Sequence, residues 1–182
     1  MSPLTQMMCL ALTALEYVCD IGRMDRASGA GKNPFLRAEV HGQVQAAVAA
    51  AAAVPRPPTL ACLIRSWREM IEDVEDGYAW SYPEFSNDSW CRDVLGRALP
   101  MLPQHAAEAI DTQLRALDEH FQRATIPWPG YEQRSGRWWQ RRVPRVLEPD
   151  VGERYASGWP LGWEMMPFPK PEAVRVVHTD CG

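Results

Sequence analysis

The sequence predicts an all-α fold, a bundle of about five helices over residues 1–126 followed by an irregular Trp- and Pro-rich C-terminal strap over residues 127–182. Apolar residues recur at the three- and four-residue spacing of amphipathic helices, and prolines and glycines separate these runs. After residue 126 the chain carries eight of its sixteen prolines, a density that ends helices and long strands. We therefore expect a helical bundle domain and a C-terminal segment packed on it.

The first two helices are predicted by proline-marked starts. Ser2-Pro3 precedes residues 4–19, whose apolar side chains cover most of a helical circumference, so this helix is expected to be buried. A polar, glycine-containing loop follows. Asn33-Pro34 then opens a second helix, which runs through an alanine tract and stops at Pro55. Alanine has the highest helix propensity but buries little area, which allows close approach of a neighbouring helix.

The third helix is predicted over residues 60–76. Thr59 is a suitable N-cap and Gly77 stands where a helix-ending glycine is expected. Its apolar positions follow the spacing of an amphipathic helix: Leu60, Leu63, Ile64, Trp67, Met70, Ile71 and Val74.

Two further helices are predicted before the strap. Residues 78–87 are expected to be an irregular aromatic stretch, after which Asn87 or Asp88 caps a fourth helix that ends near Leu99. Pro100 and Pro103 frame a turn. The fifth helix then carries the clearest apolar seam of the chain: Ile110, Leu114, Leu117 and Phe121.

The strap is expected to contain only short extended pieces, over residues 142–147 and 173–177. A free proline-rich tail is normally poor in aromatic residues. This one is rich in them, so we expect its rings to anchor an ordered segment: Trp128, Trp138, Trp139, Trp159, Trp163 and Phe168.

The composition predicts where the protein is located in the cell and which kinds of partner are not expected. The formal net charge is −4, from 19 Lys+Arg against 23 Asp+Glu, so nucleic acid is not the expected partner. The five cysteines follow neither a disulfide nor a zinc spacing. Apolar runs are too short to span a bilayer. These features predict a cytoplasmic protein with no membrane partner.

Four carboxylates share one face of the third helix. Glu69, Glu72, Asp73 and Asp76 stand at positions i, i+3, i+4 and i+7. Like charges at this spacing destabilise a helix, and anions are disfavoured near its C-terminus. A plain solvated face remains one interpretation. A crowded acidic face held against both penalties also suggests a surface for a basic partner.

We therefore predict a non-enzymatic protein-interaction module that needs no cofactor and binds a basic protein. The most specific form of this prediction is an immunity or antitoxin-type inhibitor or an adaptor. Large rings after the acidic helix are candidate anchors for the partner: Trp80, Tyr82 and Trp90.

Two carboxylate pairs support an alternative. Glu72 and Glu75 form an E-x-x-E motif, and Glu108 and Asp111 form an E-x-x-D motif on the fifth helix. Carboxylate oxygens suit Mg²⁺. These motifs resemble the metal-binding motifs of all-α nucleotide pyrophosphohydrolases of the MazG and dimeric dUTPase type. The resemblance implies Mg²⁺-dependent hydrolysis of a nucleoside triphosphate, with these four residues as the metal ligands.

A basic strip in the strap supports a second alternative. Its arginines, which flank Trp138 and Trp139, are Arg134, Arg137, Arg141, Arg142 and Arg145. Arginines interleaved with aromatic rings can bind nucleic acid. They can equally fold back on the protein, with guanidinium groups over tryptophan faces and bonded to carboxylates of the acidic helix. The acidic net charge favours this internal role or a protein partner. Asp118, Glu119 and His120 can also lie near the acidic helix.

Overall fold

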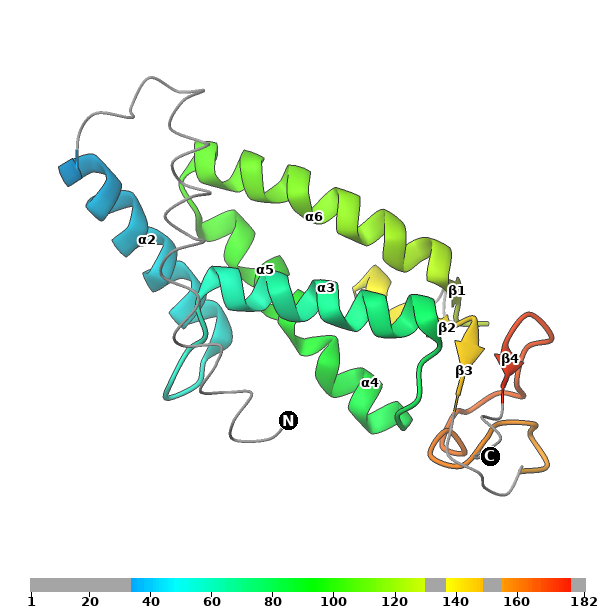
Figure 1. Ribbon diagram of the computed structural model, residues 1–182. Helices are drawn as coiled ribbons and strands as arrows, with labels where there is room; N and C mark the ends of the chain where they lie inside the picture. Colours follow the sequence, from blue (N-terminus) through cyan, green and yellow to red (C-terminus); the bar gives the residue numbers. More distant parts are fainter. Residues whose placement is uncertain (1–33, 130–136, 149–154, 178–182) are drawn as a thin grey trace, which may run out of the picture. The chain divides into compact units, whose positions relative to one another are not determined.

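The computed structural model describes residues 34–129, 137–148 and 155–177, and these are mainly helical (Figure 1). The helices are α2 (Pro34–Ala52), α3 (Leu60–Asp76), α4 (Tyr82–Asp88), α5 (Trp90–Ala98) and α6 (Gln104–Ala124). The short elements are the 3-10 turns η1 (Leu99–Met101) and η2 (Trp138–Arg141) and the strands β1 (Thr125–Pro127), β2 (Arg142–Pro144), β3 (Val146–Leu147) and β4 (Arg175–Val176). The predicted all-α class is confirmed.

Helices α2, α3 and α6 match the predicted second, third and fifth helices. The Thr59 hydroxyl accepts a hydrogen bond from the Cys62 backbone N–H at 3.2 Å, as an N-cap does. Gly77 ends α3 with φ of 129°, which glycine adopts without strain. The helix predicted over residues 4–19 lies outside the described residues.

The prediction of an irregular stretch over residues 78–87 is wrong, because this stretch contains α4. The Glu84 carboxylate accepts hydrogen bonds from the Ser81 backbone N–H at 2.9 Å and from the Ser81 hydroxyl at 2.7 Å. Pro83 stands in the first turn, where its missing N–H costs nothing. The Ser-x-x-Glu sequence is the signature of a capping box, and it starts a helix of seven residues.

The next helix also begins later than predicted. Ser89, and not Asn87 or Asp88, precedes α5, and its carbonyl accepts hydrogen bonds from the N–H groups of Arg92 and Asp93 at 3.1 and 3.3 Å. The helix count is therefore made up differently from the prediction: among the described residues, α4 adds a helix that the sequence pattern did not indicate.

The chain divides into two compact units. The first comprises Met1–Arg65 with Val94–Gln113, and the second comprises Ser66–Asp93 with Leu114–Gly182. Helices α3, α5 and α6 each contribute residues to both units. The described residues 127–129, 137–148 and 155–177 fall in the second unit, together with parts of three helices and the whole of α4.

In the first unit, the alanine-rich α2 buries Val44, Ala47 and Val48. The Arg97 guanidinium of α5 donates a hydrogen bond of 2.9 Å to the carbonyl of Ala51. This carbonyl belongs to the last turn of α2, whose carbonyls lack partners within the helix. The end of α2 is therefore held by a side chain.

In the second unit, the C-terminal segment forms two small strand pairs. Strands β1 and β2 are antiparallel, with Ile126 opposite Val143, and β3 and β4 are parallel. Strands β2, β3 and β4 lie within the two extended pieces predicted from the sequence.

Buried rings hold the same segment in place. Trp159 and Trp163 are 0% and 1% exposed and stack with ring centroids 5.8 Å apart. Trp163 also lies 5.7 Å from the ring of Phe85 on α4. These tryptophans are among the anchors that the sequence predicted, and they build the core of the second unit.

Candidate functional site

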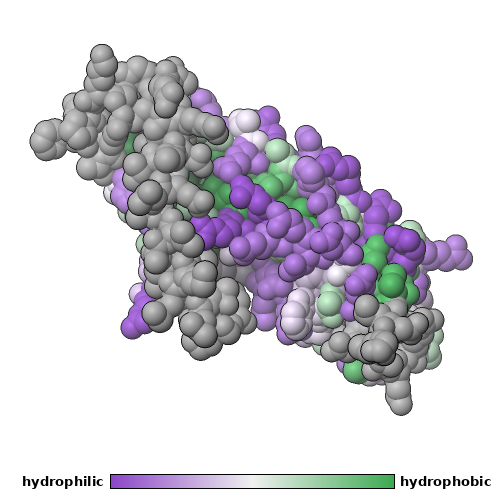
Figure 2. Space-filling view, viewed as in Figure 1, coloured by the Kyte–Doolittle hydropathy of each residue, from purple (hydrophilic) through white to green (hydrophobic). Residues whose placement is uncertain are grey.

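The acidic face of α3 consists of the exposed side chains Glu69, Glu72, Asp73 and Asp76. The opposite side of the helix carries Trp67, Ile71 and Val74, which are at most 2% exposed. This division orients the helix, because rotating it would expose the apolar side chains to water. Figure 2 shows hydrophilic residues gathered over the C-terminal half of α3.

The four carboxylates of the acidic face have no cationic partner among the described side chains. Within the described residues, no ion pair or side-chain hydrogen bond neutralises Glu69, Glu72, Asp73 or Asp76. Partial burial raises the pKa of Asp73, and the neighbouring charges of Asp88, Asp76 and Glu72 raise it further. The raised pKa of Asp73 thus has two causes, first its partial burial and then repulsion by the neighbouring carboxylates.

Asp88 of α4 extends the acidic face. The Tyr78 hydroxyl donates a hydrogen bond of 2.8 Å to the Asp88 carboxylate, and Tyr78 itself is fully buried. Burial, followed by the Asp88 hydrogen bond, raises the pKa of Tyr78 far above its ordinary value. The phenol therefore stays a neutral donor and fixes Asp88 beside the end of α3.

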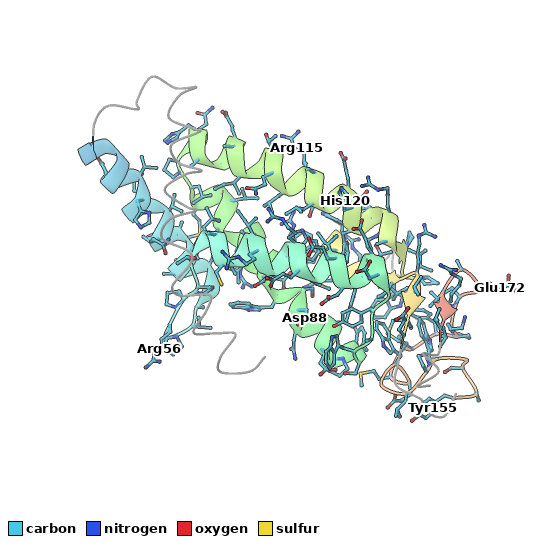
Figure 3. The ribbon with its side chains drawn as sticks, in the orientation of Figure 1. Arg56, Asp88, Arg115, His120, Tyr155 and Glu172 are labelled. Atoms are coloured by element: carbon cyan, nitrogen blue, oxygen red, sulfur yellow. The ribbon has the colours of Figure 1, made fainter. Side chains whose placement is uncertain are left out.

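Glu75, which also lies on α3, has a partner. Its carboxylate is 2.8 Å from Nδ1 of His120 on α6, and both side chains are substantially exposed. Figure 3 labels His120 on α6 and Asp88 on α4. The expectation that residues 118–120 lie near the acidic helix is confirmed for His120 and for Asp118, which accepts a hydrogen bond from the Trp67 indole N–H of α3.

A buried polar cluster in the second unit escaped the sequence analysis. Arg92 of α5 donates two hydrogen bonds to the two carboxylate oxygens of Asp118 on α6, at 2.9 and 2.7 Å. The Trp67 indole N–H of α3 donates a third to Asp118 at 3.1 Å. Arg92 and Trp67 are 26 and 51 residues from Asp118 along the chain, so no local sequence pattern predicts the cluster.

A second carboxylate, that of Asp93 on α5, binds the C-terminal segment. Asp93 accepts hydrogen bonds from the Trp139 indole N–H at 2.7 Å and from the Gln140 amide at 2.8 Å. The Arg137 guanidinium lies 3.0 Å from the same carboxylate. The Arg92 guanidinium stacks 4.2 Å from the centroid of the Trp139 ring. Both carboxylate clusters are thus internal.

The basic strip is used mainly at the C-terminus of α6. Arg142 donates to the Gln122 carbonyl at 2.9 Å, and Arg145 donates to the Arg123 carbonyl at 2.8 Å. The Thr125 hydroxyl donates to the Phe121 carbonyl at 2.6 Å. Carbonyls of the last turn lack partners within a helix and carry the negative end of its dipole, so arginines bind them well.

The basic strip therefore has an internal role, but with different partners from those expected. Arg137 binds Asp93 on α5, and Arg142 and Arg145 bind α6. The sequence analysis suggested carboxylates of the acidic helix as partners, but none of these three contacts is to the acidic face of α3. Arg141 is half-buried, and Arg134 lies outside the described residues.

The three candidate aromatic anchors differ in exposure. Trp80 is 57% exposed and Trp90 is 38% exposed. Tyr82 is half-buried, with its ring 5.7 Å from Trp163 and 6.2 Å from Trp128 in edge-to-face contacts. Trp80 and Trp90 are accessible to a partner, whereas Tyr82 supports the surface from beneath.

No family model, curated protein or solved structure matches this chain.

The carboxylates of the alternative metal site are distributed over the two units. Glu72 and Glu75 lie in the second unit and Glu108 and Asp111 in the first. The Glu108 carboxylate accepts a hydrogen bond from Gln104 at 2.9 Å. Across residues 34–129, 137–148 and 155–177, no group of three or more His, Cys, Asp and Glu side chains is arranged to hold a metal ion. In those same residues, every helix is too short or too polar to cross a bilayer.

Proposed function

We propose that this chain is a protein-interaction module that binds a basic protein through the acidic face of α3. The observation that carries the proposal is that four exposed carboxylates on one helix face have no cationic partner among the described residues. Keeping them together costs free energy in the isolated protein, because like charges repel. A partner that brings positive charge would relieve this repulsion on binding.

The use of the arginines supports the same proposal. Arg92, Arg137, Arg142 and Arg145 bind carboxylates or helix carbonyls elsewhere in the second unit. The chain thus supplies cations to other sites and leaves the acidic face open. An uncompensated surface charge increases the rate of encounter with an oppositely charged protein.

The exposed rings of Trp80 and Trp90 supply candidate anchors, because tryptophan is enriched among residues that dominate binding energy.

Cys62 and Cys91 are thiols, and burial raises the pKa of Cys91 to about 12, so it is unreactive. Thiols suit a cytoplasmic protein. Within this proposal, neutralising a basic toxin and adapting a basic subunit to a larger complex are the two forms we favour.

The test uses a fluorescently labelled nonaarginine peptide as the basic probe. We expect the double variant Glu72→Lys and Asp76→Lys to bind it about tenfold more weakly than the wild type at low salt. The matched control Glu39→Lys and Glu172→Lys makes the same charge change at two exposed positions outside the acidic face. It should bind almost as tightly as the wild type.

Salt provides the internal check. Exposed charges are screened beyond about 8 Å at physiological ionic strength, so the difference between the two double variants should shrink as salt is added. Equal losses in both variants would show that only net charge matters, and this result would remove the acidic face as a specific site.

A further inference from the structure

Two segments far apart in the sequence are joined next to the end of α3. The Tyr82 backbone N–H donates to the Gly162 carbonyl at 2.9 Å, and the Trp163 indole N–H donates to the Trp80 carbonyl at 2.9 Å. A Cβ at Gly162 would lie 2.8 Å from the Cβ of Ser81, and Gly162 has φ of 83°. Only glycine allows this close approach.

The joined segments expose three large apolar side chains, which we call the apolar patch. Trp80 is 57% exposed, Leu161 is 51% exposed and Met165 is 52% exposed. The backbone beneath them is anchored, since Trp163 and Met166 are 1% and 5% exposed. Exposed apolar side chains on two segments that hydrogen bonds hold together are suited to form a contact surface.

Carboxylates border the apolar patch. Glu84 is bound to Ser81, and these hydrogen bonds lower the pKa of Glu84, which keeps it ionised. Glu164 is exposed and stands between Leu161 and Met165 in the chain. Lys170, in the same C-terminal segment, donates to the carbonyls of Pro171 and Val174. The two charged side chains placed next to the patch, Glu84 and Glu164, are therefore both negative and form its border.

The negative border selects the occupant. A second copy of the chain would bring carboxylates against carboxylates, and an anionic membrane surface would be repelled. A basic segment with apolar side chains fits both the border and the patch. Asp76 and Trp80 are separated by four residues, at most about 14 Å of extended chain, so a short peptide can reach the acidic face and the patch together.

We infer that the apolar patch receives apolar side chains of the same basic segment that binds the acidic face of α3. This inference rests on the proposed function and adds the chemistry of the partner: a segment in which arginine or lysine alternates with large apolar residues. The acidic face supplies attraction, and the patch supplies the contact that slows dissociation.

The test compares two peptides of equal charge, nonaarginine and a twelve-residue peptide of nine arginines and three leucines. We expect the wild type to bind the leucine-containing peptide about tenfold more tightly, which is the effect of burying part of one or two leucine side chains. The double variant Leu161→Ser and Met165→Ser should lose this preference and keep its affinity for nonaarginine. Val54→Ser and Met101→Ser, which change two other exposed apolar residues, should retain the preference.

The outcomes separate the inference from the function on which it rests. If the substitutions in the acidic face do not weaken the binding of nonaarginine, the proposed function is overturned. The inference alone is overturned in two cases in which the acidic-face variants do weaken the binding of nonaarginine. In the first, the wild type binds the leucine-containing peptide no more tightly than nonaarginine. In the second, the double variant Leu161→Ser and Met165→Ser keeps the preference for the leucine-containing peptide. A wild-type dimer that these two substitutions convert to a monomer in sedimentation would likewise overturn it, because a second copy would then cover the patch.

Discussion

The Asp118 carboxylate accepts three hydrogen bonds while only 11% of its side chain is exposed. Two come from the Arg92 guanidinium in a bidentate arrangement, and the third from the Trp67 indole. Transferring two charges out of water is costly, and the geometry recovers that cost only while both partners remain. The pair therefore fixes how α3, α5 and α6 meet within the second unit.

Replacing Asp118 with asparagine should destabilise the protein by about 3–5 kcal/mol, because the Arg92 charge would stay buried without a counter-charge. Urea unfolding followed by tryptophan fluorescence measures this change. The neighbouring Glu119→Gln alters an exposed carboxylate and should change stability by less than about 0.5 kcal/mol. A small loss in Asp118→Asn would mean that Arg92 finds water or another acceptor.

The ionised carboxylate of Asp73, unlike that of Asp118, destabilises the folded protein. Its pKa is raised in the folded protein by burial and by the charges of Asp88, Asp76 and Glu72, so the folded state binds its proton more tightly than the unfolded state. Stability from this group is then present at low pH and is lost as pH rises through the window above the ordinary value of 3.8.

Asp73→Asn should therefore stabilise the protein at pH 7 and give no gain at pH 3, where the carboxyl is protonated. Thermal unfolding at both pH values tests this. Glu164→Gln, at an exposed carboxylate of the C-terminal segment, should have little effect at either pH. A loss of stability in Asp73→Asn at pH 7 would contradict the repulsion that the acidic face implies.

At the scale of elements, the end of α6 shows how the basic strip is used. Carbonyls of the last turn accept from the side chains of Thr125, Arg142 and Arg145, and the Ala124 carbonyl accepts from the Arg145 backbone N–H. The basic strip therefore binds the strand segment to the end of α6, and Arg142 and Arg145 have a structural role there.

Arg142→Met should remove the hydrogen bonds that Arg142 donates to Thr125 and to the Gln122 carbonyl, while keeping an apolar stem of similar length. We expect a loss of about 1.5–3 kcal/mol, the usual contribution of hydrogen bonds from a charged donor, and faster amide exchange in the last turn of α6. Arg68→Met, at an exposed arginine of α3, is the control. Unchanged exchange in the last turn would show that the Thr125 hydroxyl suffices to hold it.

Helix α4 marks what the sequence pattern could and could not predict. Long amphipathic runs such as α3 and α6 were predicted within a few residues, because burial of one face decides their conformation. Helix α4 has seven residues and a single buried side chain, Phe85, so periodicity is not visible. The Ser81–Glu84 capping box indicates this helix instead, and apolar spacing alone does not reveal it.

At the scale of the whole molecule, the acidic face and the exposed rings were predictable because both lie in local sequence. The internal partners of the arginines were not, since Arg137 reaches Asp93 across 44 residues and Arg92 reaches Asp118 across 26. Charge composition gives the supply of cations, but only the fold decides which carboxylates they bind. The apolar patch was missed for the same reason.

The C-terminal segment supplies core side chains to the second unit. Val143 and Leu147 are fully buried, as is Trp159. A chain ending at residue 129 should therefore expose apolar surface, bind a hydrophobic dye and lose the near-ultraviolet circular dichroism of packed tryptophans. Cooperative unfolding of the shortened chain at the same temperature as the full chain would contradict this role.

The proposed function requires that the acidic face of α3 is an open site for positive charge. Titrating nonaarginine into isotope-labelled protein and following amide chemical shifts tests it directly. We expect the largest shifts on residues 69–80 and on Asp88, and we expect these shifts to vanish in the Glu72→Lys and Asp76→Lys variant. Shifts spread evenly over all exposed carboxylates, or centred on the first unit, would contradict it.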